Sequence, residues 1–314
     1  MSLKYGIIGT GAIGGYYGAK LAKAGDDVHF LFHNDYEYVK ANGLQIDSVN
    51  GSFHLSDLAV YHNTKDMPQC DVVLVCLKST NNYLLRDMLP PLLHQHTLVL
   101  LIQNGIGLEE DLQNCFPKLH IAAGLAFICS GRFEKGVISH QDFGKLTIAP
   151  YSCDDEALMA QVISDFNKAG VECATGKYNT ARWKKAVWNI PFNGLTVVLN
   201  TTTDKLLANE QTESLVKDIM VEVIRAANNI GTEEPIGESF ADAMIKATKQ
   251  MTPYSPSMKL DYDFGRPMEV YYLYSRPVIE ARKAGYEMHL ASMLDRQLSF
   301  ISETIANINS ETKE

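Results

Sequence analysis

Apolar and polar residues alternate in two different ways along this chain, and the change falls near residue 178. Before that point, short apolar runs alternate with helical stretches such as 15–23, a pattern typical of buried parallel strands joined by helices. Four of these runs predict strands: 3–8, 28–32, 72–77 and 98–102. Beyond it the apolar period is helical, most clearly at 215–230 and 290–308. We predict an α/β domain at 1–177 and an all-helical domain at 178–314.

The remaining part of the first domain predicts additional strands. Asn50-Gly51 lies between two short apolar runs and suits a type I′ turn, so residues 44–55 are expected to form a hairpin. Further along we expect three strands at 120–129, 136–140 and 146–149, a helix at 154–169 and a last strand at 171–175. Together these elements predict an open α/β sheet.

Composition narrows the classes of function. The chain has 314 residues, 46% of them hydrophobic, and a formal net charge of −9. This charge argues against nucleic acid or an anionic membrane as the partner, and no apolar run is long enough to span a bilayer. The six cysteines are scattered without a CxxC pair, so we expect reduced thiols in a cytoplasmic protein and no metal site.

The first predicted strand runs into Gly9-Thr10-Gly11-Ala12-Ile13-Gly14, and a helix follows. In this context GxGxxG is typical of a Rossmann-type dinucleotide-binding domain. Gly9 permits the tight turn, Gly11 lets a pyrophosphate approach the backbone, and Gly14 allows close helix packing. Ala12 and Ile13 lie directly before the helix predicted at 15–23, whose free N–H groups would face the phosphates. We therefore expect Gly9, Gly11, Ala12, Ile13 and Gly14 to contact a cofactor; the alternative is a glycine-rich turn without a ligand.

The end of the second strand indicates which nicotinamide cofactor is bound. An acid there binds the ribose 2′-hydroxyl of NAD, whereas donors or cations accept the 2′-phosphate of NADP. His33 and Asn34 are able to donate to a phosphate, but Asp35 lies about 20 residues past Gly14, the spacing of an NAD-type acid. The residues leave both cofactors open.

Two more polar residues follow buried strands. Lys78 comes after the run at 72–77, and Asn104 precedes Gly105 after the run at 98–102. In an open α/β sheet the carboxyl ends of strands form the ligand-binding edge, so both are candidate site residues. Separately, Lys78 is better explained as a solvated loop lysine and Asn104 as a turn residue before glycine; together, their matching positions favour a functional role.

The helix that opens the second domain carries a polar stripe. Lys185, Asn189 and Asn193 are spaced four residues apart and share one face, while Trp183, Trp188 and other apolar residues surround them. Buried polar groups need partners from protein, water or ligand, so the stripe is a candidate catalytic surface. The alternative is that Lys185 is a surface lysine beside Arg182 and Lys184.

Taken together, these motifs resemble the ketopantoate reductase (2-dehydropantoate 2-reductase) family over nearly the whole chain. The resemblance implies that Lys185 is the general acid, that Asn189 and Asn193 lie in the substrate site, and that Lys78 and Asn104 contact the cofactor, Asn104 also the substrate. Ser257 and Glu269 keep the family's twelve-residue separation. Ser257 would then bind substrate, and Glu269 would act in catalysis and contact the cofactor. Alone, Ser257 is expected to cap a helix after Pro256, and Glu269 to be a surface acid near Arg266.

The resemblance implies reduction of ketopantoate to pantoate in pantothenate biosynthesis, with hydride from NADPH and with NAD also possible. Many members place Arg where this chain has His33. We expect the partner to be a small 2-oxo acid, and the protein to be a monomer or homodimer. The alternatives are another 2-oxo-acid or β-hydroxyacid dehydrogenase, although the latter family has glycine where this chain has Ala181, and a non-catalytic NAD(P)-sensing protein.

Overall fold

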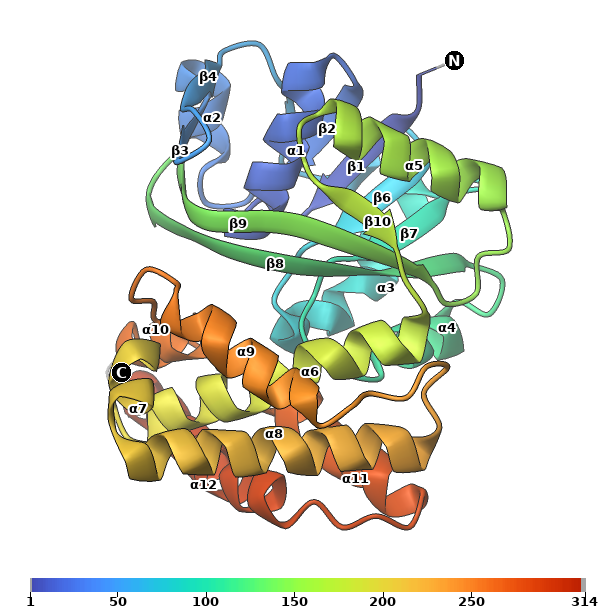
Figure 1. Cartoon of the computed structure of the whole chain (residues 1–314). Helices are drawn as coiled ribbons and strands as arrows, with labels where there is room; N and C mark the ends of the chain where they lie inside the picture. The colour runs from blue at the N-terminus through green and yellow to red at the C-terminus, as the bar shows by residue number, and fades with distance from the viewer. Residues whose placement is uncertain (1, 312–314) are drawn as a thin grey trace. The chain divides into compact units, whose positions relative to one another are not determined.

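The computed structural model describes residues 2–311, which form two compact units (Figure 1). The α/β unit comprises Met1–Gln103 and Leu108–Tyr178, and the helical unit comprises Asn104–Gly107 and Asn179–Glu314. The short segment Asn104–Gly107 thus belongs with residues far along the chain. Each unit is described separately below.

The α/β unit is built on one ten-stranded sheet in the order β4-β3-β9-β8-β7-β6-β1-β2-β5, with β10 paired to β9. From β5 through β8 along this order all neighbours are parallel, and only β8–β9 and β3–β4 are antiparallel pairs. The bounds of the strands are β1 Lys4–Ile8, β2 Asp27–Leu31, β3 Leu44–Ser48, β4 Phe53–Leu55, β5 Ala59–Tyr61, β6 Val72–Val75, β7 Leu98–Leu101, β8 His120–Glu134, β9 Val137–Pro150 and β10 Cys173–Thr175. This is the Rossmann-type arrangement that the sequence predicts.

The centre of the sheet is apolar because it is covered by helices. Every residue of β6 and β7 is buried, which explains their uninterrupted apolar sequences. Gly18 of α1 lies so close to Phe30 of β2 that a Cβ there would be 2.6 Å from the ring. The helices of this unit are α1 Ala12–Ala24, α2 Tyr36–Asn42, α3 Leu85–Met88, α4 Leu108–Cys115 and α5 Glu156–Lys168.

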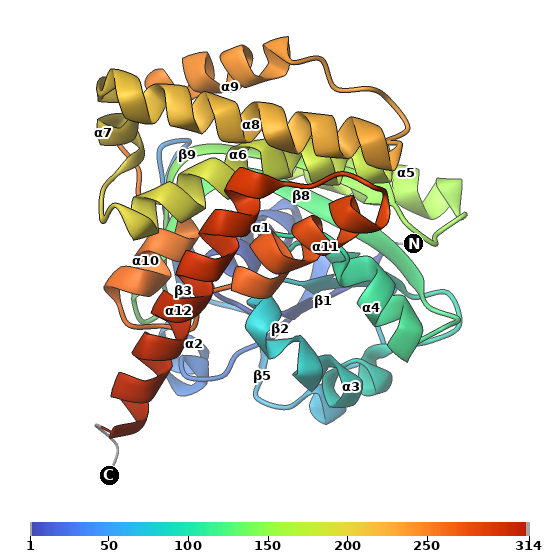
Figure 2. The ribbon, with the colours of Figure 1, turned by 90° about the horizontal axis from the view of Figure 1, so that it is seen from below.

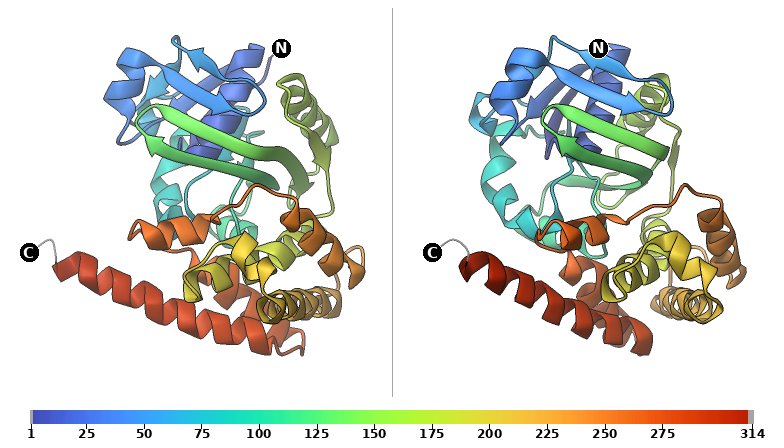
Figure 3. Two further views of the ribbon diagram at one scale, coloured as in Figure 1. Left: turned by 60° about the vertical axis from the view of Figure 1, so that its left-hand side comes forward. Right: turned by 90° about the vertical axis from the view of Figure 1, so that its left-hand side faces the viewer.

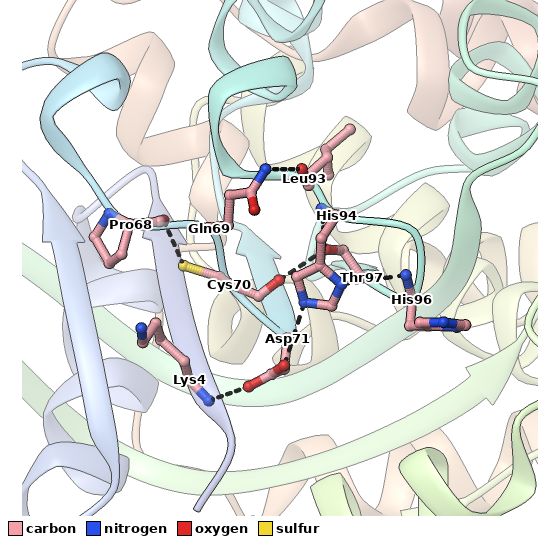
Figure 4. A network of polar contacts seen from close by, with 9 residues as sticks. All are labelled: Lys4, Pro68, Gln69, Cys70, Asp71, Leu93, His94, His96 and Thr97. Carbon is pink, nitrogen blue, oxygen red and sulfur yellow. Dashed lines mark hydrogen bonds and ion pairs between the residues drawn. The ribbon is translucent and has the colours of Figure 1, made fainter.

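A polar network fastens the amino ends of the central strands (Figure 4). The Asp71 carboxylate accepts the backbone N–H of Lys4 at 2.8 Å and contacts His94 Nε2 at 3.2 Å. Thr97 accepts the N–H of His94 and donates to the carbonyl of Cys70 at 2.7 Å. These bonds satisfy the strand ends before β1, β6 and β7, so the amino-terminal edge of the sheet has a structural role.

Residues 120–150 correct the sequence-based prediction of three short strands. They form two long antiparallel strands, β8 and β9, which Figure 3 shows beside the β3–β4 hairpin. The register shifts at Phe127/Ile128, Cys129/Ser130 and Gly131/Glu134, and Phe143 has a positive φ of 59°. These irregularities interrupt the apolar alternation without ending the strands, which is why the pattern reads as breaks. The hairpin at residues 44–55 is confirmed, but the type I′ turn is wrong, because Gly51 has φ 101° whereas Asn50 does not have a positive φ.

The helical unit confirms the prediction for residues beyond 178. Its helices are α6 Tyr178–Val198, α7 Thr203–Ala208, α8 Glu210–Ile230, α9 Ser239–Lys249, α10 Ser257–Asp263, α11 Arg276–Lys283 and α12 His289–Glu311, with a π-helical segment at Tyr271–Ser275. In Figure 2, α8 and α9 lie side by side. α12 contacts α8 and the π-helical segment. Within residues 2–311, none of the helices combines the length and apolar character that a bilayer crossing requires.

Carboxylates from neighbouring segments cap two helices of this unit. Glu222 of α8 accepts the backbone N–H groups of Leu290 and Ala291 at the start of α12, both at 2.9 Å. Glu233 accepts those of Asn179 and Thr180 at the start of α6, at 3.0 and 2.8 Å. A carboxylate at a helix N-terminus satisfies donors that have no partner inside the helix. The Glu222 cap therefore fixes where α12 begins, and the Glu233 cap fixes where α6 begins.

Candidate active site

The turn after β1 has the geometry that a dinucleotide requires. Gly9 has φ +91°, and a Cβ there would lie 2.5 Å from the backbone nitrogen of Leu77. A Cβ on Gly14 would lie 2.4 Å from the carbonyl oxygen of Gly9. A Cβ on Gly11 would meet nothing within 4 Å. Gly9 and Gly14 are thus needed for packing, whereas the backbone at Gly11 borders open space.

The segment after β2 resolves the role of Asp35. His33 and Asn34 are exposed, but Asp35 is only 4% exposed. Its carboxylate contacts Arg132 Nη1 at 2.6 Å and accepts the N–H of Gly136 at 3.3 Å. Asp35 is therefore held by β8 and the following turn, and its position does not suit an acid that binds ribose. Arg132 lies 97 residues away, and no local pattern in the sequence indicates this pairing.

Lys78 lies where β6 ends, directly before a 3₁₀ turn at Ser79–Leu84, and is half-buried. Gln103, which follows β7, donates its amide to the carbonyl of Leu77 at 2.8 Å and to Asn82 Oδ1 at 2.6 Å. β6 and β7 are parallel and in register, so their carboxyl ends form one edge as predicted. Gln103 is buried and fastens the segment that carries Lys78, a supporting role that the sequence analysis did not assign.

The helical unit contains a pocket around Lys185. Lys185 and Asn189 of α6 line it together with Arg182, Gly105 and Tyr272. Gly105 has φ +115°, and a Cβ there would lie 2.6 Å from the Cβ of Tyr272, so only glycine allows this approach. Ile106 donates its N–H to the carbonyl of Tyr272 at 3.0 Å. The Asn-Gly turn is therefore fixed against the π-helical segment beside the predicted general acid.

The environment of Lys185 favours proton transfer near neutral pH. The pKa of the Lys185 amine is lowered to about 7: loss of solvation lowers it most, the Arg182 guanidinium also lowers it, and the Glu269 carboxylate opposes both. Glu269 is 5% exposed, so the alternative that it is a surface acid is wrong. Arg182, three residues before Lys185 on the same helix, is also buried. Lys185 therefore lies in a coupled cluster in which Arg182 and Glu269 act on its pKa in opposite directions.

Asn193 has structural contacts, and Ser257 begins a helix that it does not cap. Asn193 is buried; its amide nitrogen donates to the carbonyl of Asn189 at 3.1 Å, and its oxygen accepts the N–H of Met258 at 3.2 Å. Ser257 is the first residue of α10 and Pro256 occupies the N-cap position, so the expectation that Ser257 is the N-cap is wrong. Because proline has no side-chain oxygen, Asn193 of α6 accepts a hydrogen bond from the first turn instead. The pocket residues around Lys185 include neither Asn193 nor Ser257.

Two polar residues of the pocket, Arg182 and Tyr272, were not among the site residues predicted from the sequence. Arg182 stands one helical turn before Lys185, and this three-residue spacing was an available signal. Tyr272 follows Glu269 by three residues, but its place in the pocket depends on the π-helical segment at Tyr271–Ser275, which no pattern indicated. Such segments occur often at functional sites.

An open α/β sheet with this glycine turn, and a helical unit with a lysine whose amine is shielded from solvent, define a dinucleotide-binding protein of two domains. Two family profiles match the chain, "Ketopantoate reductase PanE/ApbA" at residues 5–152 and "Ketopantoate reductase PanE/ApbA C terminal" at residues 177–302. The chain belongs to the ketopantoate reductase family.

Individual relatives agree with this assignment. The chain is 43% identical over 304 residues to the 2-dehydropantoate 2-reductase of Nostoc sp., covering 95% of each chain. The crystal structure of 2-dehydropantoate 2-reductase from Geobacter metallireducens is similar with a TM-score of 0.91 and 37% identity, covering 96% of this chain and 99% of that one. The enzyme from Methylococcus capsulatus gives a TM-score of 0.86 and 31% identity, covering 96% and 98%.

Proposed function

We propose that the protein reduces 2-dehydropantoate to pantoate with NADPH, a step of pantothenate biosynthesis, in the cytoplasm. The single observation that supports this most is Lys185, whose amine has a pKa lowered to about 7 in a pocket shared with Asn189. A group with this pKa is suited to deliver a proton at neutral pH. The likeness to 2-dehydropantoate 2-reductases supports the choice of substrate.

The α/β unit would hold the cofactor. Gly11 leaves space for the pyrophosphate, and Ala12 and Ile13 begin α1, whose first N–H groups suit an anion. His33 and Asn34 are exposed donors for a 2′-phosphate, and NADPH is proposed over NADH on this ground. When bound, the nicotinamide supplies the hydride. Lys78, fixed after β6, would offer a positive charge to this anionic ligand.

The helical unit would hold the oxo acid and protonate it. As the carbonyl carbon is reduced, charge develops on its oxygen, and the Lys185 ammonium stabilises this charge and gives up its proton. Glu269 raises the pKa of Lys185 and so keeps a fraction of the amine charged. Asn189 and Asn104 would orient the substrate, with Asn104 also meeting the cofactor. Glu269 would also contact the cofactor and accept the hydroxyl of ketopantoate.

Ser257 and Asn193 would act together at the substrate. Asn193 fastens the first turn of α10 through Met258, next to Ser257. The Ser257 hydroxyl would then donate to a carboxylate or hydroxyl of the substrate. Asn193 would contribute by positioning this turn.

A turnover panel tests the proposal. Ketopantoate and other 2-oxo acids are supplied with NADPH or NADH, and consumption of the cofactor is followed by absorbance. Efficient oxidation with ketopantoate alone supports the proposed function. Preference for another acid makes the protein a different 2-oxo-acid or β-hydroxyacid dehydrogenase. Dinucleotide binding without turnover of any acid indicates a sensing protein.

A further inference from the structure

We propose that His62 and His33 together form the binding site for the 2′-phosphate of NADPH, and that this pair makes the preference for NADPH over NADH increase as the pH falls. The proposal rests on the cofactor role given above to the α/β unit. Its basis is that the two imidazole rings, both exposed, lie with centroids 5.8 Å apart and planes inclined by only 19°. Nothing in the sequence indicated that His33 and His62 are neighbours, because they lie 29 positions apart.

The sheet places this histidine pair beside the glycine turn. β1, β2 and β5 are adjacent and parallel, with Ile8 opposite Leu31 and Leu31 opposite Tyr61. Gly9, His33 and His62 therefore follow three neighbouring strands at one edge of the sheet. A ribose directed from the glycine turn toward β2 reaches the end of that strand, and β5 is only about 4.8 Å farther.

The turn and the histidine pair are also joined by hydrogen bonds. Thr10 within the glycine turn donates its hydroxyl to the carbonyl of Leu31, the last residue of β2, at 2.8 Å. Phe32 continues the ladder by donating to the carbonyl of Tyr61 at 2.8 Å. His33 and His62 thus follow backbone that is rigidly connected to the pyrophosphate site.

The chemistry of the pair selects a phosphate monoester. Such a group carries about −1.5 to −2 charges near pH 7, and each imidazole offers it an N–H donor. Two protonated imidazoles at this distance repel each other, and a dianion bonded to both offsets the repulsion. Binding of NADPH therefore favours protonation of the pair, whereas the neutral hydroxyl of NADH gives no such gain. Tyr36, with its ring 5.3 Å from that of His62, packs against the pair on the side of α2.

The surrounding charges do not reverse this preference. Asp35 is the acid nearest in sequence to His33, and its carboxylate is already paired with Arg132 at 2.6 Å. Lys40 of α2 donates to the Tyr36 hydroxyl at 3.2 Å, adding a positive charge on that side. The other charged residues on the adjoining segments are Glu37 of α2 and, in the turn after β5, Lys65 and Asp66. Counting these residues, with Asp35 and Arg132 included, the adjoining charges sum to zero.

The test measures binding without turnover. NADP⁺ and NAD⁺ are titrated calorimetrically into the full chain at pH 8.5 and 6.5, a range in which imidazoles take up their proton. His62→Phe keeps an aromatic ring on Tyr36 and removes both ring nitrogens. His96→Phe is the matched control, because His96 is also exposed but lies at the amino-terminal edge of the sheet (Figure 4).

For the unaltered protein we expect the ratio of NADP⁺ to NAD⁺ affinity to rise about fivefold or more from pH 8.5 to 6.5. His62→Phe should weaken NADP⁺ about tenfold more than NAD⁺ and abolish most of this rise, the scale of a charge-assisted hydrogen bond. His96→Phe should behave like the unaltered protein. Equal weakening of both dinucleotides by His62→Phe, or a ratio independent of pH, overturns the histidine-pair site alone. Binding of neither dinucleotide overturns the proposed function with it.

Discussion

The pH dependence of turnover is the sharpest test of the lysine site, because Lys185 must be protonated to act as a general acid. With a pKa of about 7, the charged fraction in the free protein is about one half at pH 7, a tenth at pH 8 and a hundredth at pH 9. We therefore expect kcat/KM with ketopantoate to fall about tenfold per pH unit above pH 8. Initial rates of NADPH oxidation at low substrate concentration measure this directly.

Two substitutions should move this descending limb of the kcat/KM profile in opposite directions along the pH axis. Glu269 raises the pKa of Lys185, so Glu269→Gln should move the limb to lower pH; Arg182 lowers it, so Arg182→Gln should move it to higher pH, each by about one unit. Lys184→Gln, at the neighbouring half-buried lysine, is the control and should leave the limb in place. Thermal melting checks that each variant is folded. A wild-type profile that stays level to pH 9, or a shift of the same sign in both variants, would refute the coupled cluster.

Four further outcomes are expected. Lys185→Ala should lower kcat about 10²- to 10⁴-fold while dinucleotide binding survives; near-normal kcat would show that another group carries the proton. Ketopantoate should exceed 3,3-dimethyl-2-oxobutanoate at least about tenfold in kcat/KM, with Glu269→Ala losing more of this discrimination than Glu269→Gln; an unchanged ratio in Glu269→Ala would remove the hydroxyl contact. Gly11→Ala should fold normally yet bind dinucleotide weakly, whereas Gly14→Ala should lower the melting temperature. Calorimetry measures both properties, and a destabilised Gly11→Ala beside a stable Gly14→Ala would contradict the assigned roles. Glu233→Gln should cost about 1 kcal/mol of unfolding free energy or less in denaturant titration.

The Glu233 cap also has a defined pH dependence. Burial raises the pKa of this carboxyl, but hydrogen bonds from Thr180 and Asn179 outweigh burial and lower it below its ordinary value. An acid with a depressed folded-state pKa stabilises the protein above its unfolded-state pKa, and this stabilisation is lost as the pH falls through the lower value. The difference in stability between Glu233→Gln and the unaltered protein should therefore be full at neutral pH and vanish in acid. A constant difference down to the acid range would contradict the cap.

Local signals explain what the sequence predicted correctly. The glycine turn includes a close contact within its own motif, because a Cβ on Gly14 would lie 2.4 Å from the carbonyl oxygen of Gly9. The apolar runs of β6 and β7 report burial on both faces, and the Asn50-Gly51 hairpin reports a positive φ. Each of these features is decided by the residues that form it.

What the sequence did not predict depends on distant partners. Asp35 has the spacing of an acid that binds ribose, but Arg132 takes its carboxylate from a strand 97 residues away. Asn193 is positioned like a substrate ligand, but the start of α10 uses its oxygen. In both cases a polar residue with the expected spacing is satisfied by protein, and only the tertiary structure shows which partner it has.

The electrostatics of the lysine site follow from the same dependence on tertiary structure. On a surface Lys185 would be fully charged at neutral pH; in its pocket, loss of solvation and Arg182 leave it only partly so. A partly charged amine is less suited to proton donation than a fully charged one, unless the bound substrate raises the pKa of the amine. A 2-oxo acid brings a carboxylate, and an anion near the amine raises its pKa just as Glu269 does. Substrate binding would therefore charge the amine where the proton is needed, while the free protein avoids the full cost of a second cation beside Arg182.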